Sequence, residues 1–365
     1  MTPVTVLMPV LNGGEYLYEA VCSILNQDFL DFELLVIDDN STDNTPEILA
    51  NLLSIDSRIR TLTNVKNLGI AQSLNIGIAN ARGSYIARMD ADDISDKERL
   101  KIQYNEFSRN ECLVMVGSNV LHVTNDGNPI YPTNFPLNDW AIRWTYIFSN
   151  PFAHPSVMIK KSALEQVGGY NTDFVVSQDY ELWGRLMDRG DVLNVGKRLV
   201  CVRRHSDSIS TVHKSAQLRN TARIQKDYVS RFLPGYECQQ DNLSHFNRSI
   251  LFSEDDGLSL RPDAKKIIDF VAEIIDAKNQ QYPGHKVNEG IGLIIGRVLV
   301  LLMLSPNRLV NICGFWRLIR QNRGSLWLGL RWVFGYVGLW ISVLGFWATI
   351  SNLSVHIRNF CRRKR

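Results

Sequence analysis

The stretch SYIARMDADDISDKERL, residues 84–100, joins a short apolar run to a dense group of acidic side chains. The run from Tyr85 to Met89 predicts a buried strand, and Asp90, Asp92 and Asp93 follow it directly. Carboxylates packed so closely repel one another unless a cation neutralises them. Mg²⁺ and Mn²⁺ prefer oxygen ligands and bind through one or two carboxylates together with phosphates. The stretch therefore favours a site for a divalent cation and a diphosphate over a turn that the acids merely cap.

Strand and helix patterns alternate through the first 120 residues on both sides of this stretch. The predicted strands are residues 4–10, 32–39, 59–64, 84–90 and 113–123. The predicted helices are residues 15–27, 44–53, 69–81 and 95–110, the last of them starting at Ser95 because Ser95 and Glu98 form a capping-box pattern. Short apolar strands separated by helices indicate βαβ crossovers. The sequence thus predicts an α/β fold with a mostly parallel sheet and helices on both faces.

Polar segments fall where three of the predicted strands end, which is the edge where such sheets bind ligands. Asp90 ends the fourth strand, and Asp38 and Asp39 end the second. A carboxylate at Asp39 can accept hydrogen bonds from a base or a ribose, although the turn residues after it also predict a helix cap. The segment PVLNGGEYL, residues 9–17, has glycines that let the backbone approach a ligand, but it lacks the spacing of a dinucleotide-binding or P-loop motif.

A second pattern follows residue 125. Residues 125–136 are turn-rich, and the predicted elements after them are a strand at 154–160, helices at 161–167 and 177–190, and a strand at 198–205. Residues 214–280 are polar and helical, with a clearly amphipathic helix at 261–277.

Asp179 is the candidate catalytic residue of this second part. If Ser177 caps the helix, Asp179 lies in its first turn and shares a face with Trp183 and Leu186. A partly buried carboxylate at a pocket edge can act as a general base, but an acid is also favourable at any helix N-terminus. The residues alone leave these two interpretations evenly balanced, and His205, a lone histidine after a strand, is more often structural.

These segments, in this order, resemble glycosyltransferase family 2, the inverting enzymes of the GT-A fold, and specifically those that build bacterial surface polysaccharides such as O-antigen and capsule. The resemblance covers about residues 3–210. It rests on PVLNGGEYL, SILNQDFLDFELLVIDDNSTDNT, NLGIAQSLNIGIANARGSYIARMDADD, NPFAHPSVMIKKSALEQVGGY, SQDYELW and VRRHSDSIS.

The resemblance implies a role for individual residues on the donor side. The nucleoside would be held by Pro9, Asn12, Glu15 and Asp39, with Asp39 at the base. Asp90 and Asp92 would form the DxD motif, in which Asp90 binds the ribose and Asp92 the metal and diphosphate. His205 would be the second metal ligand, and the metal would be Mn²⁺ or Mg²⁺. Asn67 and Ala91 complete the donor-side contacts that the resemblance implies.

On the acceptor side the resemblance implies that His154, Gly169 and Trp183 border the substrate and that Asp179 is the catalytic base. Asp179 would deprotonate an acceptor hydroxyl, which attacks the anomeric carbon of a nucleotide sugar, expected to be a UDP-sugar, and inverts its configuration. The family often has Glu-Asp where this chain has Gln178-Asp179. The base is kept, but a neighbouring charge is absent.

Two other functions compete with this interpretation. A sugar nucleotidyltransferase also combines an α/β sheet with acidic metal ligands, but it would need a basic triphosphate loop, and residues 9–17 contain no Lys or Arg. A nucleotide-sugar-binding partner without catalysis is suggested only by Gln178.

The last segment, residues 290–365, differs sharply from the rest of the chain. It contains eleven basic residues, no Asp or Glu, and five of the eight tryptophans. Residues 332–357 carry no charged side chain, and a bilayer core takes about 20 helical residues to cross. Small residues recur here at spacings of three and four, which lets helices approach closely in a membrane or an oligomer; they are Gly335, Gly338, Ser342, Gly345 and Thr349.

We expect this segment to attach to a membrane, and interfacial helices explain its charge slightly better than a span does. A hairpin packed on the catalytic domain is the alternative. Nucleic acid is not expected as a partner, because the basic residues lie in apolar sequence.

The sequence predicts three parts. They are a catalytic domain at 1–213 (nucleotide half 1–125, acceptor half 126–213), a helical extension at 214–289, and the basic segment at 290–365. A lipid-linked glycan acceptor and a location on the cytoplasmic face of the plasma membrane would follow.

The cysteines fit that location. Six of them lie scattered along the chain without a CxxC pair, which argues against a disulfide framework or zinc knuckle and favours a reducing compartment. The start MTPVTVLMPV has no basic region before its apolar run and predicts a strand instead of a signal peptide.

Overall fold

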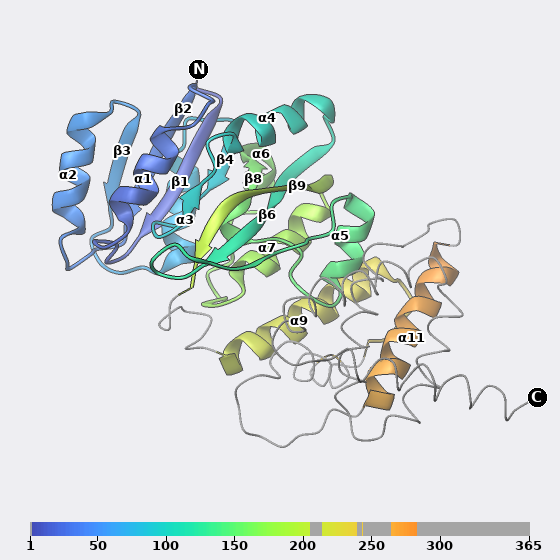
Figure 1. Cartoon of the computed structure of the whole chain (residues 1–365). Helices are drawn as coiled ribbons and strands as arrows, with labels where there is room; N and C mark the ends of the chain where they lie inside the picture. Colours follow the sequence, from blue (N-terminus) through green and yellow to red (C-terminus); the bar gives the residue numbers. More distant parts are fainter. Residues whose placement is uncertain (1, 205–213, 239–242, 244–263, 283–365) are drawn as a thin grey trace, which may run out of the picture. The chain divides into compact units, whose positions relative to one another are not determined.

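The computed structural model describes residues 2–204, 214–238, 243 and 264–282 (Figure 1). The strands are β1 (Val4–Val10), β2 (Phe32–Asp38), β3 (Ile59–Thr63), β4 (Tyr85–Arg88), β5 (Ile94–Ser95), β6 (Leu113–Val123), β7 (Pro129–Pro132), β8 (Met158–Lys160) and β9 (Asp191–Arg203). The helices are α1 (Leu17–Leu25), α2 (Thr45–Ile55), α3 (Ile70–Asn80), α4 (Arg99–Arg109), α5 (Asp139–Tyr146), the 3-10 turn η1 (His154–Ser156), α6 (Lys161–Gln166), α7 (Gln178–Met187), α9 (Lys214–Phe232) and α11 (Ala264–Gln281).

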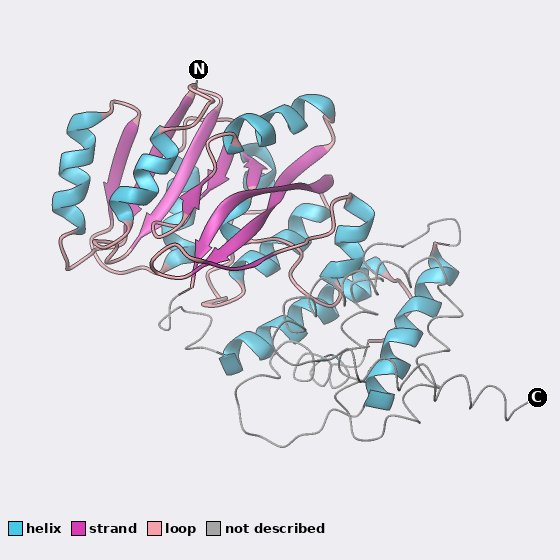
Figure 2. Cartoon of the chain, in the orientation of Figure 1, coloured by secondary structure: helices cyan, strands magenta, loops and turns pink. Residues whose placement is uncertain are grey.

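The strands form one mixed sheet in the order β3-β2-β1-β4-β8-β6-β9-β5, with β7 paired to β6 (Figure 2). The first four strands pair in parallel, as predicted. Strand β8 is antiparallel to both of its neighbours, whereas β6 and β9 are parallel to each other. Six strands (β1, β2, β3, β4, β6 and β9) therefore run in one direction, and their carboxyl ends lie along one edge of the sheet. The parallel arrangement is interrupted only in the second half, where β5, β7 and β8 run the opposite way.

Successive residues of β1 face two different helical layers. Val6 and Met8 belong to an apolar core that also contains buried residues of α1, α2 and α4. Leu7 points to the other face, where it packs so closely on α3 that a Cβ on Gly77 would lie 2.2 Å from Leu7 Cδ1. Burial on both faces is the reason that β1 and β2 read as continuous apolar runs. The predicted helices on both faces of the sheet are confirmed for this half.

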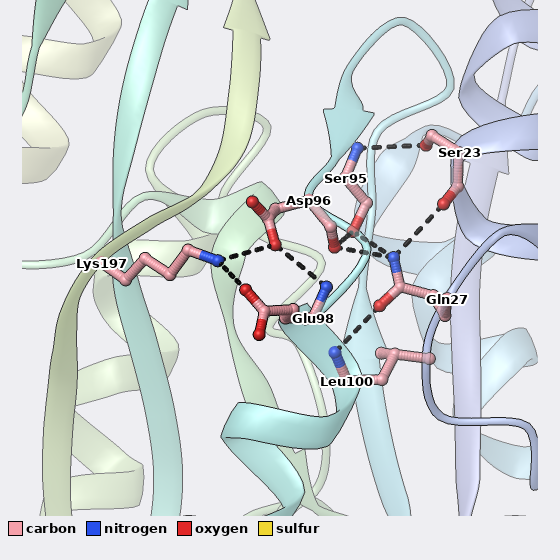
Figure 3. Close-up of polar contacts among 7 residues, drawn as sticks. All are labelled: Ser23, Gln27, Ser95, Asp96, Glu98, Leu100 and Lys197. Carbon is pink, nitrogen blue, oxygen red and sulfur yellow. Dashed lines mark hydrogen bonds and ion pairs between the residues drawn. The ribbon is translucent and has the colours of Figure 1, made fainter.

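The helix predicted from Ser95 starts only at Arg99, so the capping-box prediction was wrong. Ser95 instead lies in β5 and pairs with Val200 of β9. Its hydroxyl accepts a hydrogen bond of 3.1 Å from Nε2 of Gln27, and its backbone N–H donates to Ser23 Oγ at 3.0 Å (Figure 3). These partners come from α1 and the turn after it, and no local pattern reveals them.

Gln27 fixes the start of α4 through three hydrogen bonds to residues 95–100, although it lies far away in sequence. Its Nε2 also donates to the carbonyl oxygens of Ser23 (3.2 Å) and Asp96 (2.8 Å), and its Oε1 accepts from the N–H of Leu100 (3.0 Å). The side chain is buried. Glu98, which the capping-box pattern assigned to the helix cap, instead contacts Lys197 together with Asp96 (Figure 3). The segment after the acidic cluster is therefore anchored on both sides.

Other elements differ in extent from the prediction. The strand expected at 154–160 is η1 followed by the short strand β8, and the strand expected at 198–205 is the second half of β9, which begins at Asp191. The turn-rich segment 125–136 contains β7, and α5 was not predicted.

The chain divides into two compact units, residues 1–251 and 252–365. In the second unit the structure describes α11. Its range, Ala264–Gln281, overlaps most of the amphipathic helix that was predicted at 261–277. Among the described residues, no helix combines the length and the apolar character needed to cross a membrane. The predictions for residues 290–365 fall outside the described residues.

Candidate active site

The loop after β1 is held against the loop after β2 by three successive backbone N–H groups. Residues 12, 13 and 14 donate, in that order, to the side chains of Ser41 (2.9 Å), Thr45 (2.9 Å) and Asp43 (3.0 Å). Asn12 has a left-handed backbone with φ of 54°, and its Oδ1 accepts a bond of 2.8 Å from the N–H of Thr42. The two loops thus form one structure beside the predicted nucleoside position.

Asp39 is buried directly after β2, and both of its carboxylate oxygens already have partners. Oδ1 accepts from Asn64 Nδ2 (2.7 Å) and from the N–H of Leu68 (2.8 Å), and Oδ2 accepts from the N–H of Gly69 (2.8 Å). Asp39 therefore also holds the loop before α3. A nucleobase bound here would share the carboxylate oxygens of Asp39 with the backbone of that loop.

The other residues predicted at the nucleoside lie around the same edge. Pro9 lies in β1 opposite Ile37, and Glu15 is exposed after β1. A hydrogen bond from the Tyr16 hydroxyl to Glu15 raises the pKa of Tyr16. Asn67 is exposed, and its Oδ1 accepts a bond of 3.1 Å from the N–H of Gly69.

The carboxylates of Asp90, Asp92 and Asp93 converge at the end of β4. They can offer one oxygen each within 4.8 Å of one another. Asp90 and Asp92 are partly exposed, whereas Asp93 is 1% exposed. Ala91 lies between them, close to Gly13 of the first loop, since a Cβ on Gly13 would lie 3.8 Å from Ala91 Cβ. The end of β4 therefore meets the loop after β1, as the parallel pairing predicts.

Asp93 supplies a test of whether this cluster suits a cation. Its Oδ1 accepts a hydrogen bond of 2.9 Å from the N–H of Arg203, but its buried Oδ2 has no hydrogen-bond partner in the described part of the chain. Burial raises the pKa of Asp93 well above its ordinary value, and the charges of Asp90 and Asp92 raise it further. The three side chains offer only oxygen ligands, and one buried carboxylate oxygen has no hydrogen-bond partner among the described residues. Such a group of ligands fits Mg²⁺ or Mn²⁺. His205, the second predicted metal ligand, lies outside the described residues.

Arg88 pairs with Asp90 from inside the sheet. Its side chain is 3% exposed, and its backbone carbonyl accepts a bond of 2.6 Å from Arg99 Nη2, which is also buried. Burial raises the pKa of Asp179 and lowers that of His154; the positive charge of Arg88 opposes the first shift and adds to the second. A single buried guanidinium thus acts on the acidic cluster and on the predicted acceptor side.

Asp179 lies in the first turn of α7, as predicted. Burial raises the pKa of its carboxyl. The opposing effects are the N–H groups of the first helical turn and a hydrogen bond of 2.8 Å from Asn150 Nδ2 to Asp179 Oδ2. The residue before the helix, Ser177, has a left-handed backbone with φ of 65°, which is uncommon for Ser. The local backbone and one amide therefore fix the direction of this carboxylate.

His154 contacts Tyr170, the residue after Gly169, and also packs against Trp183 of α7. His154 Nε2 is 2.9 Å from the Tyr170 hydroxyl, and desolvation by burial lowers the pKa of His154 well below its ordinary value, so the ring is neutral. Asn75 of α3 bonds both the N–H and the carbonyl of Tyr170, each at 2.8 Å. Gly169 has φ of 71°, and a Cβ there would lie 2.4 Å from Asn75 Oδ1. A glycine is therefore needed at this turn.

Trp183 is fully buried. Its indole makes edge contacts with the rings of His154 and Phe152, with centroids 5.8 and 5.9 Å apart. Trp183, which was predicted to border the substrate, is instead a buried side chain that packs against the ring of His154.

Sequence reasoning missed Arg88, Asn150 and Arg203, whereas the turn of Gly168, Gly169 and Tyr170 was expected to border the acceptor. Arg88 and Arg203 each end a strand whose other residues are mostly apolar, and a buried arginine in such a run is a signal that was available. Asn150 lies in an irregular segment, and only the folded chain brings it to Asp179.

Comparison with known sequences agrees with this geometry. The model of the family described as "Glycosyl transferase family 2" matches residues 5–168. The chain is 31% identical over 246 residues to an O-antigen biosynthesis glycosyltransferase, WbnJ, of Escherichia coli, covering 67% of this chain and 88% of that protein. It is 29% identical over 240 residues to an uncharacterized glycosyltransferase of Haemophilus influenzae, covering 63% and 74%. A chondroitin synthase of Pasteurella multocida is 28% identical over 220 residues, covering 60% of this chain and 22% of that protein.

Solved structures support the fold. The structure of S. aureus TarS 1–349 in complex with UDP-GlcNAc superimposes with a TM-score of 0.55 at 16% identity, covering 88% of this chain and 91% of that one. The same protein in complex with UDP gives a TM-score of 0.53.

Proposed function

Because the chain belongs to glycosyltransferase family 2, we propose that it transfers a sugar from a nucleoside-diphosphate sugar to a hydroxyl of a lipid-linked glycan, with inversion at the anomeric carbon. The proposal assigns the donor to the edge formed by β1, β2 and β4, and the acceptor to the side of α7. A UDP-sugar is the proposed donor, which the nucleotide-bound structures of TarS support.

On the donor side, the loops after β1 and β2 would enclose the nucleoside. Asp39 holds the loop before α3 in place, while Asn12 fixes the first loop to the second. Asp90 would bind the ribose and is itself positioned by Arg88. These contacts exist within the protein, so the donor would meet a preformed site.

The acidic cluster would hold the divalent cation. Asp92 is the proposed ligand, and the buried Oδ2 of Asp93, which has no hydrogen-bond partner among the described residues, lies beside it. When bound, a divalent cation neutralises the charge that develops on the departing diphosphate. The protein's own contribution is to keep three carboxylates together at a cost in repulsion that the cation removes.

On the acceptor side, Asp179 would take the proton of the attacking hydroxyl. Its carboxylate is held by Asn150, and a raised pKa makes it a stronger base than an ordinary Asp. The new bond forms between the hydroxyl oxygen and the anomeric carbon as the bond from that carbon to the diphosphate oxygen breaks. Attack opposite the leaving group inverts the configuration, so an α-linked donor gives a β-linked product.

The observation that carries the proposal is the position of Arg88. The same buried guanidinium forms an ion pair with Asp90, and its charge opposes the rise in the pKa of Asp179 that burial causes. The N–H of Arg88 also donates to the carbonyl oxygen of Val157, directly after η1, at 2.9 Å, and His154 of η1 packs on Trp183 of α7 with ring centroids 5.8 Å apart. The end of β4 and the helix that carries the proposed base therefore share η1 as a neighbour, and sugar transfer requires a donor site and a general base close together.

A lipid-linked acceptor and a place on the cytoplasmic face of the plasma membrane are part of the proposal. They are supported by the O-antigen name of one relative and by the basic, tryptophan-rich composition of residues 290–365. The same segment is proposed to mediate membrane attachment or self-association.

The test is a two-stage screen of the full-length protein. Nucleotide sugars are first screened for Mn²⁺-dependent binding by calorimetry, and the tightest donor is then offered with lipid-diphosphate glycans. We expect one donor to bind only with the cation and to be transferred. Donor binding without any transfer or hydrolysis would favour an inactive binding partner, and binding of a nucleoside triphosphate with a sugar phosphate would favour a nucleotidyltransferase.

A further inference from the structure

Arg203, the last residue of β9, contacts α1 and the loop after β4. Its Nη2 lies 2.5 Å from Oε2 of Glu19 in α1, and its Nη1 donates to the backbone carbonyl of Asp92 at 3.3 Å. Its backbone N–H donates to Asp93 Oδ1 at 2.9 Å. One residue thus joins α1, the acidic cluster and the end of β9.

The guanidinium is buried while its acidic partner is not. The Arg203 side chain is 3% exposed and the Glu19 side chain 58%. The guanidinium carbon lies 4.6 Å from the ring centroid of Tyr16, whose hydroxyl bonds Glu15. Burying an arginine is costly unless its hydrogen bonds are satisfied. The contacts to Glu19, Tyr16 and Asp92 supply most of that compensation and hold Nη1 and Nη2 in place, whereas the buried Nε has no hydrogen-bond partner in the described part of the chain.

Because Arg203 bonds Asp92 and Asp93, it restricts the positions that the acidic cluster can take. A cation bound by Asp92 and its neighbours needs their oxygens held at fixed positions, because the free energy of ordering them would otherwise reduce its affinity. Neighbouring groups that bond metal ligands commonly change metal affinity by about 10–100-fold when they are removed. The bonds of Arg203 to the backbone of Asp92 and to the carboxylate of Asp93 place it in such a role.

We propose that Arg203 is a positioning residue that fastens the Asp90–Asp93 loop to α1 and thereby sets the affinity for the divalent cation and the donor diphosphate. The inference rests on the proposed function, because it concerns the same donor site. Arg203 would act through Asp92 and Asp93 and would not itself take part in the chemistry.

The experiment measures Mn²⁺ binding to the full-length protein directly, from the electron paramagnetic resonance signal of free Mn²⁺, with UDP, GDP, CDP or dTDP present. The variants are Arg203→Gln, Arg203→Lys and Glu19→Gln. Arg204→Gln is the matched control, since Arg204 is the adjacent arginine but bonds His122 and Tyr131 instead of the acidic loop. Thermal unfolding of each variant reports whether it is folded.

We expect Arg203→Gln to weaken Mn²⁺ binding by about tenfold, with Arg203→Lys recovering part of the loss. Glu19→Gln, at an exposed position, should fold normally and weaken binding by roughly threefold, and Arg204→Gln should stay within about twofold of the wild type. If Arg203→Gln fails to fold, Glu19→Gln decides. The inference is overturned if Arg203→Gln or Glu19→Gln lowers only the melting temperature, or if Arg204→Gln weakens Mn²⁺ as much. If the wild-type protein binds no Mn²⁺ in the presence of any of the four nucleotides, the result instead contradicts the proposed function.

Discussion

Asn150 donates a hydrogen bond of 2.8 Å from Nδ2 to Oδ2 of Asp179, which links an irregular segment to the first turn of α7. This bond favours the charged form of the carboxylate and lowers the pKa of Asp179, against the larger effect of burial, which raises it. The proposed base works only when ionised. The balance of these two effects therefore decides at which pH transfer is lost on acidification.

Replacing Asn150 with Ala should raise the pKa of Asp179 further. Because the base must be deprotonated, the acid limb of the profile of kcat/KM against pH should move to higher pH, while the alkaline rates change less. The profile is measured with the donor found in the screen. Asn80→Ala, on the exposed end of α3, is the control and should leave the limb unmoved. A limb that stays in place in Asn150→Ala would mean that Asp179 is not the titrating base.

Asp92 and Asp96 come from the same acidic stretch but have different surroundings. Asp92 belongs to the convergent cluster, whereas Asp96 lies 3.1 Å from Lys197 Nζ. Asp92→Asn should weaken Mn²⁺-dependent donor binding by at least about tenfold, because a ligand charge is lost. Asp96→Asn should leave that binding within about twofold and cost roughly 0–1 kcal/mol of stability, as partly exposed ion pairs do. Calorimetry of both variants decides, and equal losses would argue against a specific metal ligand.

The positions of these acids show how far the sequence could lead. Strand ends in a parallel sheet share one edge, so the proximity of Asp39 and Asp90 followed from the alternation of strands and helices alone. Asp179 was placed in a first helical turn by spacing, and the structure has it there.

The errors arose where distant contacts decide local structure. Ser95 and Glu98 have the spacing of a capping box, yet Ser95 is taken into β5 by its pairing with β9 and by the side chain of Gln27. Those partners are far away in sequence, and tertiary contacts override a local preference worth about 1 kcal/mol. Arg88 and Asn150 escaped notice for the same reason, because their roles depend on partners that only the fold supplies.

Gln27→Ala tests the anchor before α4. The substitution removes four hydrogen bonds and leaves the N–H of Leu100 buried, so we expect a loss of about 2–4 kcal/mol in the free energy of unfolding. Chemical denaturation of the full chain measures it. Gln72→Ala, at an exposed position of α3, should change that free energy by less than about 0.5 kcal/mol. A similarly small change in Gln27→Ala would show that the anchor contributes little.

Gly169→Ala and Gly127→Ala separate backbone strain from a direct clash. Both glycines have positive φ, 71° and 80°, but a Cβ meets Asn75 Oδ1 at 2.4 Å only at position 169. Strain alone should cost about 1–2 kcal/mol at either site. Gly169→Ala should lose roughly 1–2 kcal/mol more, since Asn75 must yield its bonds to Tyr170. Unfolding free energies of the two variants are compared, and equal losses would contradict the close approach seen at Gly169.

The proposed function depends above all on Asp179 acting as the base of a sugar transfer. The most direct measurement compares Asp179→Asn with Asp173→Asn, an exposed acid on the preceding loop, for transfer rate and for donor binding with Mn²⁺. We expect Asp179→Asn to lose transfer by at least about 100-fold and to keep donor binding within about twofold, while Asp173→Asn is unchanged in both. Transfer by Asp179→Asn at the wild-type rate would contradict it.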